Sequence, residues 1–456
     1  MDGTGQSPSE LTRGADIPLL TAWAPSQRPI LRAVDVLRGA IALLVIANLG
    51  RIPVFSTGDR EAPLLVNDLC VAAVVSAGIL VSLTRRSFQL DRVGLAALCF
   101  AGVGGFSAIY SASRFGLTSF ELFVSLAYLA RWVLYLSLYL VIVNVVRASD
   151  VTPVWRALEA SVLLLAGFGI VQAIFLPGFA QIVYPESRPV LDWDIQGHRL
   201  VSTIVEPNIA GAMIMSILLI QLAQYSVGAS VPSWKPLVLF VALVLTLSRS
   251  AAVGLVFGIG VIVLVYGIPK RLLRFAGVIA LIVLATLPKL IAFAAAYGKF
   301  SLSGSAASRL TSWAIDFRVF LDHPWIGIGF NTYGFVAERF YGIPRLGGSN
   351  YSNDGGLLFA GVMTGVTGVA VLLWMFRLVI RRCQAVWRAP SVSAEHRGIA
   401  IGTAAVVVAI CVHSVFVNSL FTTFVMEIMW VLLGLTFAIA RGDDALKGQD
   451  AKASRT

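Results

Sequence analysis

Charged side chains are scarce in this chain, and acidic ones are the scarcest. Only 13% of the 456 residues are Asp, Glu, Lys or Arg, whereas soluble proteins carry about a quarter. Hydrophobic residues make up 57%. A soluble fold this apolar could not cover its surface, so the excess must face lipid. The composition excludes a cytosolic enzyme, a secreted disulfide scaffold and a disordered chain. It predicts an all-α polytopic membrane protein.

Cysteine and histidine are also few, at four of each. Cys70, Cys99 and Cys411 lie in apolar stretches, Cys383 lies in an Arg-rich segment, and no CxxC spacing occurs. These spacings predict neither a disulfide nor a metal site. The first 30 residues contain no apolar run of the signal-peptide kind and are rich in polar residues. We expect residues 1–36 to form a disordered cytoplasmic tail.

Long apolar runs, by contrast, fill most of the chain. A membrane-spanning helix needs about 20 apolar residues. We predict about 12 transmembrane helices within a single membrane domain over residues 37–440, followed by a cytoplasmic tail at 441–456. The predicted spans are 37–54, 62–83, 93–112, 120–146, 155–176, 208–227, 234–248, 251–268, 273–294, 355–377, 398–416 and 421–440.

The basic residues orient these spans. The net charge is +11, and most Lys and Arg lie in short segments between apolar runs. That distribution follows the positive-inside rule and is unlike the basic groove of a nucleic-acid-binding protein. With twelve spans, the basic clusters fall on the same side as the N-terminal tail. We therefore expect a multi-pass protein of the cytoplasmic (inner) membrane with both termini in the cytoplasm and no nucleic-acid partner.

Two long segments then fall on the outer side, over about residues 177–207 and 295–353. Loops of this length are usually functional. The second contains an amphipathic pattern over Ser308–His323, where Leu310, Trp313 and Phe317 recur at helical spacing. We expect this helix to lie along the outer membrane face.

Three arginines break the charge rule by falling on the outer side: Arg199, Arg249 and Arg309. The planar guanidinium suits phosphate oxygens. Convergence of the three in one outer cavity would bind an anionic ligand, and a diphosphate on a lipid carrier fits that description. The competing interpretation is that they reach lipid headgroups or pair with nearby acids.

Arg131 is different because it lies inside a predicted span. An arginine at membrane depth is costly and is normally paired or functional. Glu427, in the last predicted span, is the candidate partner. The pair is then either purely structural, or Arg131 contacts the phosphates of the ligand.

Four stretches resemble the O-antigen ligase and polymerase family of the Wzy and WaaL type. Within about residues 199–368 they are Arg199 with Glu206–Gly211, then Leu245–Ala252, then Arg309–Trp313 with His323–Phe330, and finally Gly365–Gly368. They are similar to the family's Arg and Pro-Asn pair, its Leu-Ser-Arg-Gly-Ala signature, its Arg-x-x-x-Trp with Pro-x-x-Gly-x-Gly, and a Gly pair after the large loop.

The resemblance implies a GT-C-like membrane glycosyltransferase that works without a metal or other cofactor. Such enzymes take a glycan from an undecaprenyl-diphosphate-linked oligosaccharide at the outer face of the membrane and transfer it to the hydroxyl of an acceptor glycan. The expected partners are these two substrates, membrane lipids and other polysaccharide assembly proteins.

The resemblance also suggests roles for individual residues. We expect Arg199 and Arg249 to hold the diphosphate, with substrate contacts from Arg309, Arg131, Ser248, Ser250, Asn208, Glu206 and Asn353. Family ligases end the large loop with a His-Asn pair, whereas the corresponding stretch of this chain, Ser349–Gly356, contains no histidine. Asp354 is therefore the candidate base, unless Asn353 and Asp354 only cap the next helix.

Other candidate bases are Glu206, His198 and His323. His323 precedes Pro324 at a turn, which favours a structural role for it. His413 is interpreted as a core residue, with a place in the cavity wall as the alternative. The absent histidine favours a polymerase of surface-polysaccharide repeats over a ligase that attaches finished glycan to lipid, glycan or protein.

Two other functional classes remain open. A lipid-linked oligosaccharide transporter would need positive charge along its whole path, and a non-catalytic scaffold would tolerate loss of the outer arginines.

Overall fold

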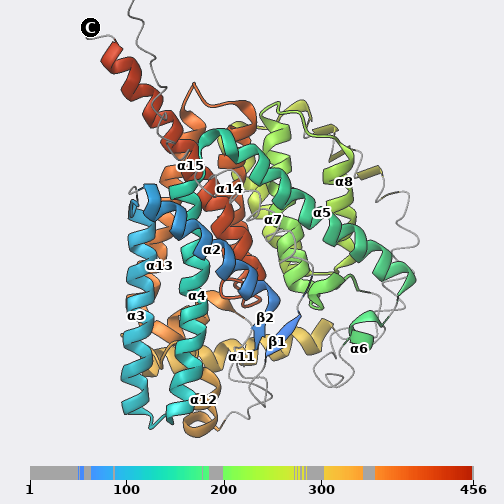
Figure 1. Ribbon diagram of the computed structural model, residues 1–456. Coiled ribbons are helices and arrows are strands. Elements are labelled where there is room, and N and C mark those ends of the chain that lie inside the picture. Colours follow the sequence, from blue (N-terminus) through green and yellow to red (C-terminus); the bar gives the residue numbers. More distant parts are fainter. Residues whose placement is uncertain are drawn as a thin grey trace, which may run out of the picture.

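The computed structural model describes residues 50, 52–55, 63–85, 88–176, 178–183, 199–271, 302–342 and 355–453, together with a few positions between 273 and 284. Within these ranges the side chains at 55, 84, 85, 181, 183, 302–309 and 444–453 fall outside the description. The fold is built almost entirely of helices (Figure 1).

The chain begins its described part with a short hairpin and continues as a series of helices. In chain order the elements are β1 (Pro53–Phe55), β2 (Leu64–Leu65), α2 (Val66–Arg85), α3 (Arg92–Arg114), α4 (Ser119–Val145), η1 (Ala148–Asp150), α5 (Val151–Phe175), α6 (Phe179–Val183), η4 (Ser202–Ile204), α7 (Pro207–Ser226), α8 (Trp234–Leu245), α9 (Arg249–Tyr266), α11 (Leu302–Asp322), α12 (Tyr333–Tyr341), α13 (Gly356–Arg388), α14 (Ala394–His413) and α15 (Thr423–Ala453). The two strands pair antiparallel.

The described residues confirm a polytopic membrane protein. Nine of their helices are long and apolar enough to span a bilayer: α2, α3, α4, α5, α7, α9, α13, α14 and α15. Each corresponds to a span predicted from the sequence. The predicted span 234–248 is the shorter apolar helix α8. The predicted spans 37–54 and 273–294 lie largely outside the described residues.

Local sequence sets where several helices begin. Asp91 caps α3 by accepting a hydrogen bond from the Gly94 amide, and Thr118 forms a capping box with Glu121 at the start of α4. Helix α7 opens with Pro207, whose missing N–H costs nothing in the first turn. These signals complement apolar runs that would otherwise leave helix boundaries undefined.

Two helices form the centre of the bundle. The apolar stretch of α15 is fully buried and that of α7 nearly so, whereas most of α9 is not covered by protein. Helix α14 packs against α7 and α9, α13 packs against α3, and α15 packs against α4. The core therefore surrounds α7 and α15, with α14 packed beside them.

The bundle has two unlike ends. Helix α11 runs across one end, close to α12 and the small hairpin, and roughly perpendicular to α3 and α4 (Figure 1). We call this the α11 end. At the opposite end the guanidinium of Arg441 donates to the Val143 carbonyl, and Lys235 pairs with Glu159. Helix termini rich in arginine, such as the end of α13, lie at that opposite end, as the charge pattern predicts.

Two predicted segments differ in detail from the structure. The amphipathic helix expected over Ser308–His323 is longer, because α11 begins at Leu302. The last helix does not stop near residue 440 but continues to Ala453, through most of the predicted tail. The predicted N-terminal tail, 1–36, lies outside the described residues.

Candidate functional site at the α11 end

The turn between α8 and α9 gathers three of the predicted site residues. Leu247 adopts a left-handed conformation with φ 52°, which reverses the chain, and Ser248 caps α9. The Ser248 hydroxyl donates to Oδ1 of Asn208 at 3.0 Å and lies 3.1 Å from the Ser250 hydroxyl. The start of α7 and this turn are thus held together by side-chain hydrogen bonds.

Arg199 joins the same turn. Its Nε donates to the Thr246 carbonyl at 2.9 Å, and the amide of Leu200 donates to the Leu245 carbonyl at 2.9 Å. Arg249 is the first residue of α9 and its side chain is exposed. The first two stretches of the family resemblance, far apart in sequence, therefore meet at one turn.

The other two stretches meet as well. Helix α13 is kinked at Gly365, where φ is 65° and ψ −169°. The kink frees carbonyls of α13 to accept hydrogen bonds from the segment that follows α11. Ile328 donates to the Val362 carbonyl at 2.9 Å, and Val366 donates to the Pro324 carbonyl at 2.7 Å.

Glycines allow the segment after α11 and helix α13 to approach each other closely. Gly327 has φ 76°, and a Cβ there would lie 2.4 Å from the Val362 carbonyl oxygen. A Cβ on Gly365 would lie 2.3 Å from the backbone carbon of Trp325. Only glycine fits at these positions. The Gly-x-Gly run thus makes a tight backbone turn between the loop helix and α13.

A cavity of about 320 Å³ opens beside this segment. Its polar lining comes from four separate parts of the chain and includes Tyr128, Arg131, Glu206, Asn331, Asn418 and Thr422. Aromatic side chains, including Trp132, Phe330 and Phe421, supply much of the remaining wall. The cavity therefore combines a cation, a carboxylate and amides with an apolar floor, which is the composition of a small-molecule site.

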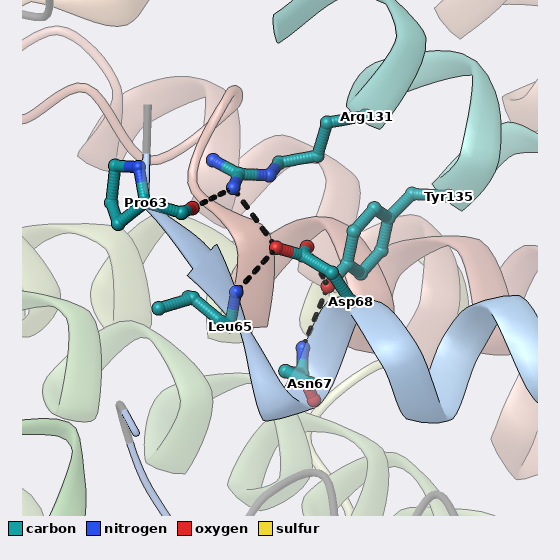
Figure 2. Close-up of polar contacts among 6 residues, drawn as sticks. All are labelled: Pro63, Leu65, Asn67, Asp68, Arg131 and Tyr135. Carbon is teal, nitrogen blue, oxygen red and sulfur yellow. Dashed lines mark hydrogen bonds and ion pairs between the residues drawn. The ribbon is translucent and has the colours of Figure 1, made fainter. Parts of the chain in front are cut away.

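Arg131 is fixed at the wall of this cavity (Figure 2). Its Nη2 pairs with Oδ2 of Asp68 at 2.9 Å and donates to the Pro63 carbonyl, and its guanidinium lies over the Tyr128 ring, 5.2 Å from the centroid. The partner of Arg131 is therefore Asp68 of α2. Our prediction of Glu427 is wrong, since the sequence does not tell which helices are neighbours.

Glu427 is nevertheless close to this cluster. It is completely buried in α15, beside Asn67, and neither of its carboxylate oxygens makes a hydrogen bond of standard geometry with the described residues. A buried carboxyl without such bonds is costly to keep. It lies within electrostatic range of Asp68 and Tyr135, so it belongs to the same group of buried polar side chains.

The α8–α9 turn and the cavity are neighbours. Glu206 lines the cavity two residues before Asn208, and Asn418 lines it one residue before Ser419. His413, fully buried, lies 3.1 Å from the Ser250 hydroxyl through Nε2 and 3.0 Å from the Ser419 hydroxyl through Nδ1. This confirms that His413 is a core residue, and it shows that the core network ties the turn to the cavity wall.

His323 directly follows α11 and is not among the residues that line the cavity. It is half-buried, outside the candidate spans, and packs edge-on against Phe115 with ring centroids 5.2 Å apart. Burial lowers the pKa of His323 below its ordinary 6.5, and the charge of Arg114 lowers it further, against an opposing contribution from Asp322. These contacts favour the structural interpretation of His323.

The remaining predicted residues are not placed. Asp354, Asn353 and His198 lie outside the described residues, and Arg309 falls in α11 with its side chain outside the description. The helix that follows Asp354 has Gly355 at its N-cap position, with no side-chain cap.

Several residues that line the cavity, or that anchor Arg131 at its wall, are not evident from the sequence. Sequence patterns mark Asp68 only as an acid inside a span, and Asn331 only as the end of the glycine run. Asn331 adopts φ 54°, a left-handed conformation that asparagine tolerates better than most residues. Its place directly after the glycine run is the one available signal. Asn418 and Tyr128 carry no signal of their own.

The match with known families covers part of the site. Residues 237–373 match the family model described as O-antigen ligase. The match supports an assignment to the O-antigen ligase and polymerase family. It spans α8 to the kinked part of α13 and thus includes Arg249, Asn331 and the segment at Gly365, while Arg131 and Glu206 lie outside it. No curated protein matches the chain.

The family indicates the general kind of reaction. O-antigen ligases and polymerases act on a lipid-linked oligosaccharide and an acceptor glycan, so the assignment indicates a function of this type in polysaccharide biosynthesis. The family assignment agrees with the fold, because nine apolar helices among the described residues indicate a multi-pass membrane protein.

Proposed function

We propose that this protein transfers a glycan from an undecaprenyl-diphosphate-linked donor to an acceptor sugar hydroxyl, and that it thereby polymerises surface-polysaccharide repeats. The observation that carries the proposal is the cavity lined by Arg131 and Glu206, which opens at the α11 end of a chain whose residues 237–373 match the O-antigen ligase model. We further propose that the α11 end faces outward, since the arginine-rich helix ends lie opposite to it.

The proposed reaction is a displacement at the anomeric carbon of the donor. The acceptor oxygen forms a bond to that carbon as the bond to the diphosphate oxygen breaks. Undecaprenyl diphosphate leaves with the bonding electron pair, and the acceptor proton passes to a base. Cationic groups stabilise the charge that develops on the leaving oxygens. We assign this role to Arg199 and Arg249 at the α8–α9 turn, with Arg131 at the cavity wall.

Asp354 is the base we propose, as the nearest carboxylate before Gly355 and α13. Glu206 is the second candidate for this role because it lines the cavity. A ligase reaction is the alternative function, favoured by the description of the matching family model. Against it stands the sequence Ser352-Asn353-Asp354, where the resemblance to ligases would require a histidine.

An assay with purified protein in lipid nanodiscs tests the proposal. Undecaprenyl-diphosphate-linked repeats serve as donor and acceptor, and products are separated by length. We expect wild type to form a ladder. Asp354→Asn should lower kcat on the order of a hundredfold or more, while binding of undecaprenyl diphosphate stays near the wild-type level, because a base acts on the acceptor and not on the diphosphate.

Asp322→Asn is the matched control. It changes an acid at the same end of the molecule that bonds the Tyr341 hydroxyl at 3.0 Å and does not line the cavity. This variant should retain turnover. An Asp354→Asn protein with unchanged turnover would remove Asp354 as the base, and a wild-type protein that makes no product would refute the polymerase function.

A further inference from the structure

The guanidinium of Arg131 is only partly engaged by the protein. An arginine has five N–H donors. Both hydrogens of Nη2 are taken, one by Asp68 and one by the Pro63 carbonyl. Nη1 and Nε have no hydrogen-bond partner among the described residues. Arg131 thus stands at the cavity wall with one nitrogen anchored and two nitrogens left to contact a ligand.

Asp68 is itself held on both of its oxygens. Oδ2 accepts from the Leu65 amide at 2.9 Å as well as from Arg131, and Oδ1 accepts from the Tyr135 hydroxyl at 3.1 Å (Figure 2). The Asp68 side chain is 2% exposed. A carboxylate fixed by three donors leaves the guanidinium little freedom to rotate.

The anchoring groups come from three directions. Tyr135 lies one turn after Arg131 on α4, and its hydroxyl also accepts from Nδ2 of Asn67 at 2.7 Å. Asp68 lies in the first turn of α2, and Pro63 directly precedes β2. The hairpin end and α4 are locked together through the arginine (Figure 2).

We propose that Asp68 is a positioning residue of the transfer reaction: it fixes the Arg131 guanidinium so that Nη1 and Nε face a phosphate group of the donor in the cavity. This inference rests on the proposed function. Asp68 also opposes the charge of Arg131, so it contributes orientation and not attraction for the anion. Its loss should therefore damage turnover more than donor affinity.

A double-mutant cycle tests the inference on purified protein in nanodiscs. Asp68→Asn should lower kcat roughly tenfold or more, while KM for the lipid-linked donor stays the same or falls, because a neighbouring negative charge is removed. Arg131→Gln should lower kcat/KM at least as much. The double variant should resemble Arg131→Gln within about twofold, since a positioning residue has nothing left to position.

Glu159→Gln is the matched control. Glu159 is a buried acid in a helix that pairs with one cation, Lys235, at the opposite end of the bundle. This variant should keep the wild-type kcat and KM. Effects of Asp68→Asn and Arg131→Gln that multiply in the double variant would overturn the positioning role, as would a drop in kcat that Glu159→Gln reproduces.

Tyr135→Phe provides a second route if Asp68→Asn does not fold. It removes the hydroxyl bond that holds Oδ1 of Asp68 and leaves the ion pair. We expect a smaller loss of kcat that vanishes in the Arg131→Gln background, and a loss that persists there would overturn the inference. Binding of farnesyl diphosphate to the wild type, compared with farnesol, which lacks the diphosphate, tests the proposed function separately from the role of Asp68. A wild-type protein that is inactive and binds neither probe refutes the proposed function, and this inference with it.

Discussion

At the residue scale, Arg131 shows what the sequence could and could not predict. Its place inside an apolar run is enough to predict an arginine that is either paired or functional, because a charge at membrane depth needs compensation. Its partner was not predictable, because Asp68 and Glu427 are both acids in apolar helices and only the packing brings Asp68 to 2.9 Å.

Three of the other site residues can be found from short motifs. Such motifs point to Ser248, Ser250 and Asn208, and the structure joins them by hydrogen bonds. Tertiary packing also adds residues that no motif could reveal, such as Asn418 and Tyr128. Asp354 stays a prediction.

His323 carries a pH prediction. Its folded-state pKa lies below the ordinary 6.5 because of burial and Arg114. As pH falls through 6.5, the unfolded chain takes up the proton first. The contribution of neutral His323 to the free energy of unfolding should therefore be fully present above pH 6.5 and should be lost as the pH falls towards the lower folded-state pKa. Melting temperatures of the purified protein between pH 7.5 and 5 measure this.

The His323→Gln variant isolates the contribution of this group. It should lose part of the acid-induced decrease in melting temperature that the wild type shows, while carboxylates account for the rest. Identical pH profiles for the two proteins would show that His323 does not contribute.

At the scale of elements, the four stretches of the family resemblance form two pairs that are in contact in the fold. The stretch at Arg199–Asn208 contacts the α8–α9 turn, and the Pro324–Phe330 segment contacts the kink in α13. Helical periodicity predicts α11, but it could not predict the kink, which arises because Gly365 takes a conformation that other residues avoid. The motifs thus describe contacts between elements as much as chemistry.

Gly365→Ala tests the importance of that contact. A Cβ at 2.3 Å from the Trp325 backbone forces the loop away from α13, and the backbone conformation adds strain. We expect destabilisation on the order of 3 kcal/mol or more, with loss of transfer activity, because Asn331 and Phe330 would leave the cavity wall. Thermal unfolding and the transfer assay measure the two effects.

Gly260→Ala is the matched substitution. Gly260 lies in α9, where an added Cβ meets nothing within 4 Å. Stability within about 1 kcal/mol of wild type is expected there. Equal behaviour of the two variants would mean that the kink at Gly365 has no special role.

At the scale of the whole molecule, apolar runs alone predict every long apolar helix among the described residues. Hydrophobicity is a strong signal because lipid requires a span of fixed length. The cavity was not predictable in the same way. It is built where α4, the start of α7, the segment after α11 and the loop between α14 and α15 converge, and no local pattern encodes that convergence.

The two unlike ends of the bundle agree with a reaction at one face. The proposed diphosphate ligands, Arg199 and Arg249, lie at the turn next to the cavity, whereas the partly exposed Lys235 at the other end pairs with the buried Glu159. A carrier would need its cationic residues along the whole path. The placement therefore favours transfer over transport.

The surface glycan of a strain that lacks this protein tests the account most directly. Gel profiles are compared for the deletion strain, the wild type and strains complemented with Arg249→Ala or Arg318→Ala. Arg318 is an exposed arginine of α11 that does not line the cavity. The account predicts collapse of the ladder to single repeats on deletion, full restoration by wild type and Arg318→Ala, and no restoration by an equally abundant Arg249→Ala protein. Full-length polymer that stays on its lipid carrier would identify a ligase instead, and an unchanged ladder with unchanged attachment would contradict the account.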